Sequence, residues 1–152
     1  MPSRALVVDA NILVRAVLGK RVRELIEAYA GDASFFVPEV AYAEAEEHLA
    51  ALVIKRGGDP EKALALLRCL GQLMELIGSE VYSEFEAEAR ERLGQRDPED
   101  WPMLAAALAL GCPIWTEIQD QIVRVCCGEG AVARSSGKRV AGLILYIHRR
   151  GI

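Results

Sequence analysis

Short apolar runs alternate along the chain with longer segments in which apolar positions recur at helical spacing. The run at 5–8 is uninterrupted and half β-branched, which is typical of a strand covered on both faces of a parallel sheet. Runs at 34–37 and 113–116 predict two further strands, and 81–82 predicts a short additional one.

Helix signals occupy the segments between these runs. Asp-Pro pairs at 59–60 and 97–98 predict helix starts, because the aspartate can cap free N–H groups and proline lacks the donor that a first turn leaves unused. Asn11 is interpreted as the N-cap of the first helix, and Gly94 and Gly111 as the residues that end two later ones. The expected helices run from 12 onward and over 22–29, 38–56, 59–77, 83–93 and 97–110.

Strands that alternate with helices predict an α/β fold, in which a central parallel sheet is sandwiched by helices in three layers. A chain of 152 residues without internal repeats or a visible linker is expected to form a single domain over 1–152. The glycines and serines of 128–137 predict a loop, and 140–148 predicts a closing helix or strand. Ligands of such sheets bind outside the carboxyl ends of the strands, so acidic residues there are candidates for chemistry.

Composition narrows the class of protein. Hydrophobic residues make up 52% of the chain and charged residues 26%, which is the balance of a packed domain rather than of a disordered segment. The longest apolar runs, such as 103–110, fall far short of the roughly 20 residues that cross a bilayer, and the start does not resemble a secretory leader. A cytoplasmic protein without a membrane partner is therefore expected.

Charge and cysteine content argue against a protein that coats nucleic acid and against a zinc site built from cysteines. The net charge of −4 disfavours a protein that coats nucleic acid by bulk electrostatics, although it is compatible with a nuclease whose metal ions carry the positive charge. The cysteines show neither a C-x-x-C pair nor a histidine at zinc-finger spacing, and we interpret them as structural or buried thiols. They are Cys69, Cys112, Cys126 and Cys127.

Two aspartates are placed where they can carry chemistry. Asp9 directly follows the first strand, so its carboxylate is expected at the carboxyl edge of the sheet, either as a functional group or as a turn-forming helix cap. Asp100 shares a helical stripe with Leu104 and Ala107, which predicts that it points toward the sheet. Because an uncompensated buried carboxylate is costly, a metal ion or dense hydrogen bonding would accompany it. Alternatively, Asp100 joins Asp97 in capping the helix start.

Glu44 is a third candidate, in the second turn of its helix and at the border of the apolar face. It can lean into a cleft, or it can belong with Glu46 and Glu47 to an ordinary solvated acidic face. Carboxylates that converge from separate elements repel one another unless a cation lies between them, and hard oxygen ligands favour Mg²⁺ or Mn²⁺ over zinc. Such a site can activate water for attack on a phosphodiester.

Several segments resemble the motifs of the PIN-domain family. Residues 7–13 (VVDANIL) resemble its first-strand motif, and 38–44 (PEVAYAE) match the place of the family's glutamate. Residues 96–105 (RDPEDWPMLA) and 112–116 (CPIWT) resemble its second signature, which is the most specific part. The resemblance runs from about residue 6 to residue 120.

The resemblance implies a metal-dependent ribonuclease fold, used by toxins of bacterial toxin–antitoxin pairs and by RNA-processing nucleases. It implies RNA as the substrate, Mg²⁺ or Mn²⁺ as the cofactor, and as partners an antitoxin protein and a second copy of the chain in a homodimer. Carried over position by position, it gives Asp9, Glu44 and Asp100 as metal-site acids. Asn11 matches a position that orients the first aspartate, and Thr116 one whose hydroxyl supports the site.

One departure from the family pattern lies after the last predicted strand. Where the family reads T-x-D-x-D-F, this chain reads TEIQDQ at 116–121, so Ile118 replaces the first aspartate and only Asp120 is present. Isoleucine cannot bind a cation, so a second metal is held weakly, or Asp120 or Glu117 substitutes. The alternative to a ribonuclease is therefore a PIN-like module that binds RNA or protein, with a degenerate metal site and little catalysis.

Other classes fit the first strand less well. A phosphatase of the haloacid-dehalogenase type needs a second aspartate two residues after the first, where this chain has Asn11, and a nucleotide-binding fold needs a glycine-rich loop there. For the ribonuclease, several basic residues are candidates to hold the substrate backbone, although scattered cations are also the usual protein exterior. They are Arg15, Lys20, Arg21, Arg134, Lys138 and Arg139.

Overall fold

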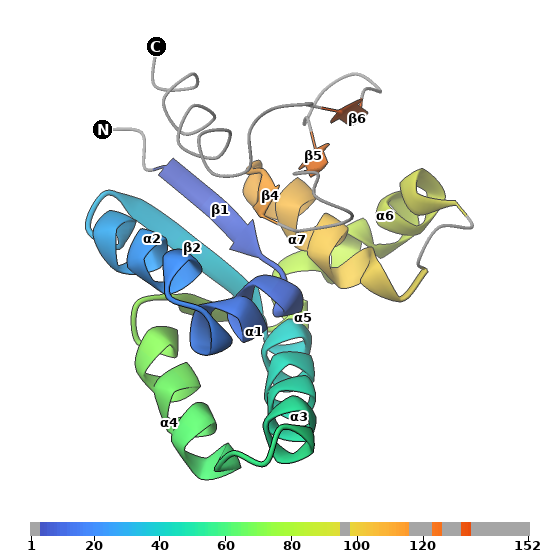
Figure 1. Cartoon of the computed structure of the whole chain (residues 1–152). Coiled ribbons are helices and arrows are strands. Elements are labelled where there is room, and N and C mark those ends of the chain that lie inside the picture. The colour runs from blue at the N-terminus through green and yellow to red at the C-terminus, as the bar shows by residue number, and fades with distance from the viewer. Residues whose placement is uncertain (1–3, 95–97, 116–122, 126–131, 135–152) are drawn as a thin grey trace.

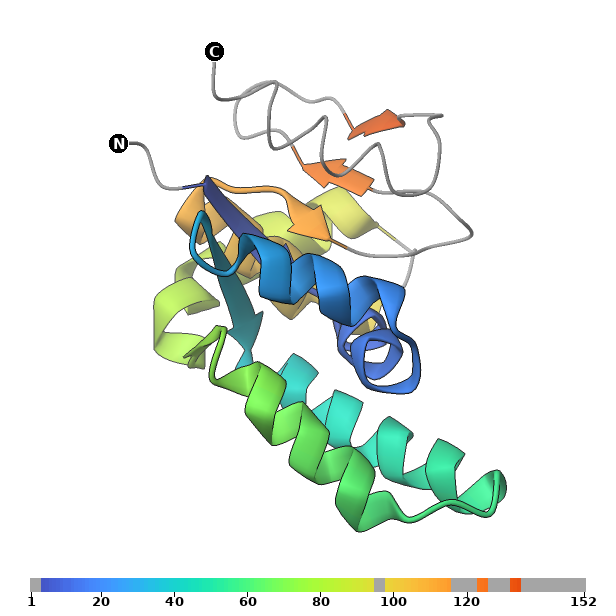
Figure 2. The same cartoon turned by 60° about the vertical axis from the view of Figure 1, so that its left-hand side comes forward.

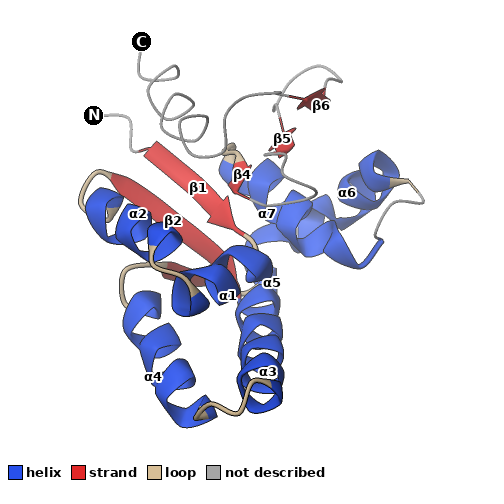
Figure 3. Cartoon of the chain, viewed as in Figure 1, coloured by secondary structure: helices blue, strands red, loops and turns tan. Residues whose placement is uncertain are grey.

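The computed structural model of the chain describes residues 4–94, 98–115, 123–125 and 132–134. Its centre is a parallel four-stranded sheet in the order β3-β2-β1-β4, with helices around it (Figures 1 and 3). The strands are β1 (Arg4–Val8), β2 (Ala33–Pro38), β3 (Glu75–Ile77) and β4 (Ile114–Trp115). The predicted α/β fold with a central parallel sheet is confirmed.

β1 is an interior strand of this sheet. It pairs with β2 on one side, where Leu6 lies opposite Phe35, and with β4 on the other, where Val8 lies opposite Trp115. Leu6, Val7 and Val8 are at most 2% exposed, so both faces of the strand are covered. This double burial explains why the first apolar run is uninterrupted rather than alternating.

Helices form a layer on each face of the sheet (Figure 2). α7 packs against β1, β2 and β4 with α5 and α6 beside it, while α1 to α4 pack with one another on the other face. α3 and α4 form a helical hairpin that extends away from the sheet (Figure 1). The bounds are α1 (Ala10–Leu18), α2 (Arg21–Tyr29), α3 (Glu39–Lys55), α4 (Pro60–Gly71), α5 (Ser79–Tyr82), α6 (Glu86–Leu93) and α7 (Trp101–Leu110), with 3-10 turns at Ser83–Phe85 and Pro98–Asp100.

α7 lies close to the sheet because its middle consists of small side chains. Ala105, Ala106 and Ala107 are 0% exposed. The helix ends at Gly111, as predicted, where a φ of 65° is the left-handed conformation that glycine adopts without a steric penalty. The chain then turns directly into β4.

Element boundaries differ from the predictions at several positions. α6 and α7 begin after 3-10 turns, at Glu86 and Trp101 rather than at 83 and 97. α1 begins at Ala10 with Asp9 at the N-cap position, so Asn11 is not the cap. α4 ends at Gly71 and β3 occupies 75–77, where the pattern predicts a continuing helix, and the strand predicted at 81–82 belongs to α5. An apolar run of a few residues fits a strand and a helix end equally well, so the pattern alone does not separate them.

The C-terminal part contributes a two-stranded antiparallel sheet of β5 (Val123–Val125) and β6 (Val132–Arg134). β6 lies inside 128–137, so the loop prediction is wrong for those three residues. A segment rich in glycine and serine can still contain a short strand, and composition alone does not show where that strand lies. The element predicted at 140–148 lies outside the described residues.

The cysteines differ in burial, and the described helices match the expectation about membrane spans. Cys112 is buried, as expected, whereas Cys69 is exposed on α4, and Cys126 and Cys127 lie outside the described residues. None of the helices in the described ranges is both long enough and apolar enough to cross a bilayer.

Candidate metal centre

The path of the chain changes direction at the centre of the sheet. From β1 it proceeds to β2 and β3 on one side, and it returns through α7 to β4 on the other side of β1. β1 and β4 are therefore neighbours at a topological switch point. Open parallel sheets bind ligands outside the carboxyl ends of the strands at such a point, so this is where a functional site is expected.

Asp9 lies at this switch point. Its backbone N–H donates a hydrogen bond to the carbonyl oxygen of Trp115, the last residue of β4, at 3.1 Å. Asp9 is half-buried, and it occupies the N-cap position of α1 without a side-chain capping hydrogen bond to the helix. A role as a helix cap therefore does not account for its carboxylate.

Asp100 lies at the start of α7, in the 3-10 turn before the helix. α7 leads into the amino end of β4, so its own first turn is at the carboxyl edge. Asp100 is exposed, and the prediction that it is buried toward the sheet is wrong. A helical wheel assigns directions only within a regular helix, and the helix begins one residue later, at Trp101.

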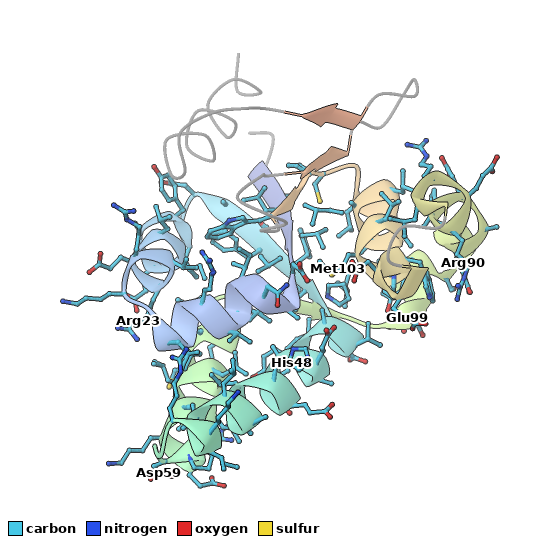
Figure 4. The ribbon with its side chains drawn as sticks, turned by 45° about the vertical axis from the view of Figure 1, so that its right-hand side comes forward. Arg23, His48, Asp59, Arg90, Glu99 and Met103 are labelled. Atoms are coloured by element: carbon cyan, nitrogen blue, oxygen red, sulfur yellow. The ribbon has the colours of Figure 1, made fainter. Side chains whose placement is uncertain are left out.

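Aromatic contacts hold this first turn at the carboxyl edge. The ring of Trp101 lies edge-on to Tyr82, with 5.8 Å between their centroids, and Tyr82 belongs to α5, which directly follows β3. The guanidinium of Arg90 lies over the same indole, 5.2 Å from its centroid. Figure 4 shows Met103, two residues further along α7, on the side that faces the sheet, while Glu99 lies at the outer end of the helix.

Glu39 is an acid of this edge that the sequence reasoning missed. It is the first residue of α3, directly after β2, just as Asp9 directly follows β1. Burial raises the pKa of Tyr82 above its ordinary value of 10.0, and the negative charges of Glu39 and Glu80 raise it further. Glu39 is thus close enough to Tyr82 to act on it, and its position directly after a strand was the signal that could have found it.

Glu44 lies further along α3 and is exposed, as are Glu46 and Glu47. This is the arrangement of the solvated acidic face that the sequence left open. Asn11 is the second residue of α1 and is also exposed, two residues after Asp9. Thr116 and Asp120 lie outside the described residues, although Thr116 is the next residue in the chain after Trp115.

The donors at this edge suit a hard divalent cation. Within the ranges that the structure describes, no three His, Cys, Asp or Glu side chains are grouped so that they could hold a metal ion, so Asp9, Glu44 and Asp100 do not form such a group by themselves. Mg²⁺, however, keeps several of its waters and is bound in many enzymes by one or two carboxylates. Carboxylates at the ends of separate elements are hard oxygen ligands, which fit Mg²⁺ or Mn²⁺ better than zinc.

The fold and the acids at the carboxyl edge of the sheet together define an α/β domain in which acidic residues directly follow the strands near the switch point. A family model described as PIN domain matches residues 7–129. The chain belongs to the PIN-domain family.

Among solved structures, the chain is similar to one in the crystal structure of VapBC2 from Rickettsia felis bound to a DNA fragment from their promoter. The two share 18% sequence identity with a TM-score of 0.57, over 74% of this chain and 86% of the other. At this identity the likeness concerns the fold. No curated protein matches the chain.

Proposed function

We propose that this protein is a Mg²⁺- or Mn²⁺-dependent endoribonuclease, a hydrolase of RNA phosphodiester bonds. Membership of the PIN-domain family supports the class of reaction. The observation that carries the proposal is the position of Asp9, whose backbone N–H bonds to the Trp115 carbonyl and so fixes its residue at the switch point between β1 and β4.

The proposed roles are carried over from the PIN-domain motifs that these positions resemble. Asp9 and Asp100 hold the principal ion, and Glu44 and Asp120 complete the shell or position the attacking water. Asn11 and Thr116 support the site. The ion, when bound, would supply positive charge for the phosphodiester and lower the pKa of a coordinated water.

The wider context is proposed on the same basis. The structural relative is a VapBC2 complex, which supports an antitoxin protein as a partner and a role as the toxin of a toxin–antitoxin pair. We further propose that residues 1–152 act as a single domain, that the protein forms a homodimer, and that it works in the cytoplasm.

Ile118 favours a second candidate function, a PIN-like module that binds RNA or protein with little catalysis. The two functions differ in metal binding. A nuclease should show saturable Mn²⁺ binding by calorimetry or electron paramagnetic resonance, and Asp9→Asn should weaken it. A module with a degenerate site should show no saturable site that Asp9→Asn disturbs.

Cleavage of a structured RNA pool with Mn²⁺, with and without EDTA, tests the proposed reaction. The parent should cut only with metal, Asp100→Asn should lose most of the activity, and Glu46→Gln, which removes the same charge from the exposed face of α3, should retain it. Equal cutting by the parent and Asp100→Asn would show that the assigned acids are wrong. An inert parent together with an active Ile118→Asp would show that the natural site has decayed.

A further inference from the structure

Charge is distributed unevenly around the carboxyl edge of the sheet. Residues 10–23, which form α1 and the start of α2, contain four cationic side chains and no Asp or Glu. Residues 39–47 at the start of α3 contain four glutamates and no Lys or Arg, and 79–93 contain five glutamates against two arginines. A polyanion that approaches this edge is therefore attracted toward α1 and α2 and repelled from α3, α5 and α6.

The two arginines of α6 add little to this field, because each is neutralised by a glutamate one turn earlier. Nε of Arg90 lies 2.9 Å from Oε1 of Glu86, and Nη2 of Arg92 lies 2.6 Å from Oε1 of Glu88. Figure 4 shows Arg90 on α6 and Arg23 on α2 at opposite ends of the molecule. The cations of α1 and α2 are thus well separated from those of α6.

α1 presents one narrow exposed stripe, which begins beside Asp9. Its other side chains are buried in the core, and the exposed ones are Asn11, Arg15 and Leu18. Asn11 and Arg15 are one helical turn apart and share a face, so their backbones are about 6 Å apart along the helix axis. The stripe therefore runs from the candidate metal centre to Arg15 and on to the turn after α1.

That turn brings further cations to the end of the stripe. The N–H of Gly19 donates to the carbonyl oxygen of Arg15 at 2.8 Å, and a Cβ at position 19 would lie only 3.1 Å from this oxygen. Glycine thus permits a tight exit from α1, after which Lys20 and Arg21 are exposed and Arg23 is half-exposed. Glu24 and Glu27 follow on α2, but within the described residues neither forms an ion pair with these cations.

We propose that the α1–α2 basic surface, defined as Arg15, Lys20, Arg21 and Arg23, binds the phosphate backbone of a single RNA strand and leads it to the edge at Asp9. This inference rests on the proposed ribonuclease function and names the surface that holds its substrate. Charges are screened within about 8 Å at physiological ionic strength, so the cations act through direct contact with phosphates. α1 is nine residues long, about 13 Å, and so the surface covers the few nucleotides next to the scissile bond.

The test measures binding without cleavage. A fluorescent single-stranded RNA of ten nucleotides is titrated with protein in EDTA, and anisotropy gives the affinity over a range of salt concentrations. The combined variant Lys20→Gln, Arg21→Gln and Arg23→Gln should bind about 100-fold more weakly at 0.1 M salt, because each lost phosphate contact removes a slope of about 0.7 from the plot of log K against log salt. The slope should fall by about 2.

The matched control is Lys55→Gln with Arg56→Gln and Lys62→Gln, which removes three exposed cations from the end of the α3–α4 hairpin (Figure 1) and should leave both affinity and slope unchanged. Circular dichroism shows whether each variant is folded. If the combined variant is unfolded, Lys20→Gln alone is measured instead, with an expected slope change of about 0.7. An unchanged slope in the α1–α2 variants, or a parent that does not bind the RNA, would overturn the proposed surface. Cleavage assays separate this outcome from the proposed reaction, since a parent that cuts RNA with unchanged binding in these variants would refute the surface alone.

Discussion

Arg90 and Arg92 lie two residues apart on α6, and each pairs with a glutamate one turn earlier. Arg90 in addition lies over the Trp101 ring. An exposed ion pair within a helix contributes at most about 0.5 kcal/mol, and an exposed cation–π contact adds about 0.5–1 kcal/mol. The two arginines can therefore be compared directly, because each forms the same kind of ion pair and only Arg90 also contacts an aromatic ring.

Arg90→Ala should lower the free energy of unfolding by about 0.5–1 kcal/mol more than Arg92→Ala does. The helix propensities and lost ion pairs are the same in both variants, so the difference reports the contact with Trp101. Urea denaturation at low and high salt measures it. If the two variants unfold at the same urea concentration, the contact does not stabilise the first turn of α7.

Tyr82 makes stability depend on alkaline pH. Its pKa is raised above 10.0 by burial and by the nearby glutamates, so the folded state keeps the phenolic proton at pH values where the unfolded state loses it. The unfolded state then binds fewer protons, and the free energy of unfolding falls as pH rises from about 10 toward the raised pKa. Below this window Tyr82 adds no pH dependence.

Tyr82→Phe should therefore flatten the decline in stability above pH 10, whatever it does to stability at pH 7. Urea denaturation between pH 8 and pH 11 gives the slope in each protein. Tyr42 also has a pKa raised by burial, with Glu46 raising it and Arg68 lowering it, so Tyr42→Phe is expected to flatten the decline as well. A parent whose stability does not change over this range would contradict the raised pKa of both phenols.

At the scale of elements, two helices end at glycines with different backbone conformations. Gly111 has φ 65° and ψ 31°, the left-handed helical region, while Gly94 has φ 61° and ψ −125°, which side chains with a Cβ rarely adopt. A Cβ would meet no atom within 4 Å at either position. Any loss of stability on substitution therefore comes from the strained backbone conformation and not from a clash of the new side chain with other atoms.

Gly111→Ala should cost about 1–2 kcal/mol of unfolding free energy, and Gly94→Ala should cost more. Gly111→Asn should recover part of the loss, because asparagine tolerates the left-handed region, whereas Gly94→Asn should recover little. Thermal or urea denaturation of the four variants tests the ranking. Equal recovery by asparagine at both positions would contradict it.

The sequence predicts elements well where a chemical signal marks both ends. Asp59 accepts a hydrogen bond from the N–H of Glu61 at 3.0 Å and starts α4, and Gly94 and Gly111 end α6 and α7, all as predicted. β3 has no such signal. It is an edge strand of three residues with two exposed side chains, so its sequence lacks the apolar run that identifies β1 as a strand.

At the scale of the molecule, the sequence predicts the edge of the site but not its geometry. Asp9 follows an unmistakable strand, and a parallel sheet sends every such residue to the same edge. The position of Asp100 depends on where α7 becomes regular and on the contacts that the next residue, Trp101, makes with Tyr82 and Arg90. Those tertiary contacts have no counterpart in local periodicity.

Metal binding should appear as added stability of the whole domain. A cation that binds only the folded state stabilises it by about 2.7 kcal/mol at 100 times its dissociation constant. Mn²⁺ should therefore raise the midpoint of thermal unfolding of the parent, and EDTA should reverse the rise. Asp9→Asn should reduce the effect and Glu46→Gln should preserve it, whereas the same rise in both variants would place the cation elsewhere.

β1 is the first strand of the four-stranded sheet to be synthesised, yet one of its two neighbours, β4, is the last strand of that sheet to be synthesised. Val8 and Trp115 pair although they are more than a hundred positions apart, so the ribosome must release β4 before Asp9 acquires its place beside it. Closing such a loop also makes folding slow. A nuclease with this strand order would remain inert until translation had passed β4, because Asp9 has no place beside Trp115 before then.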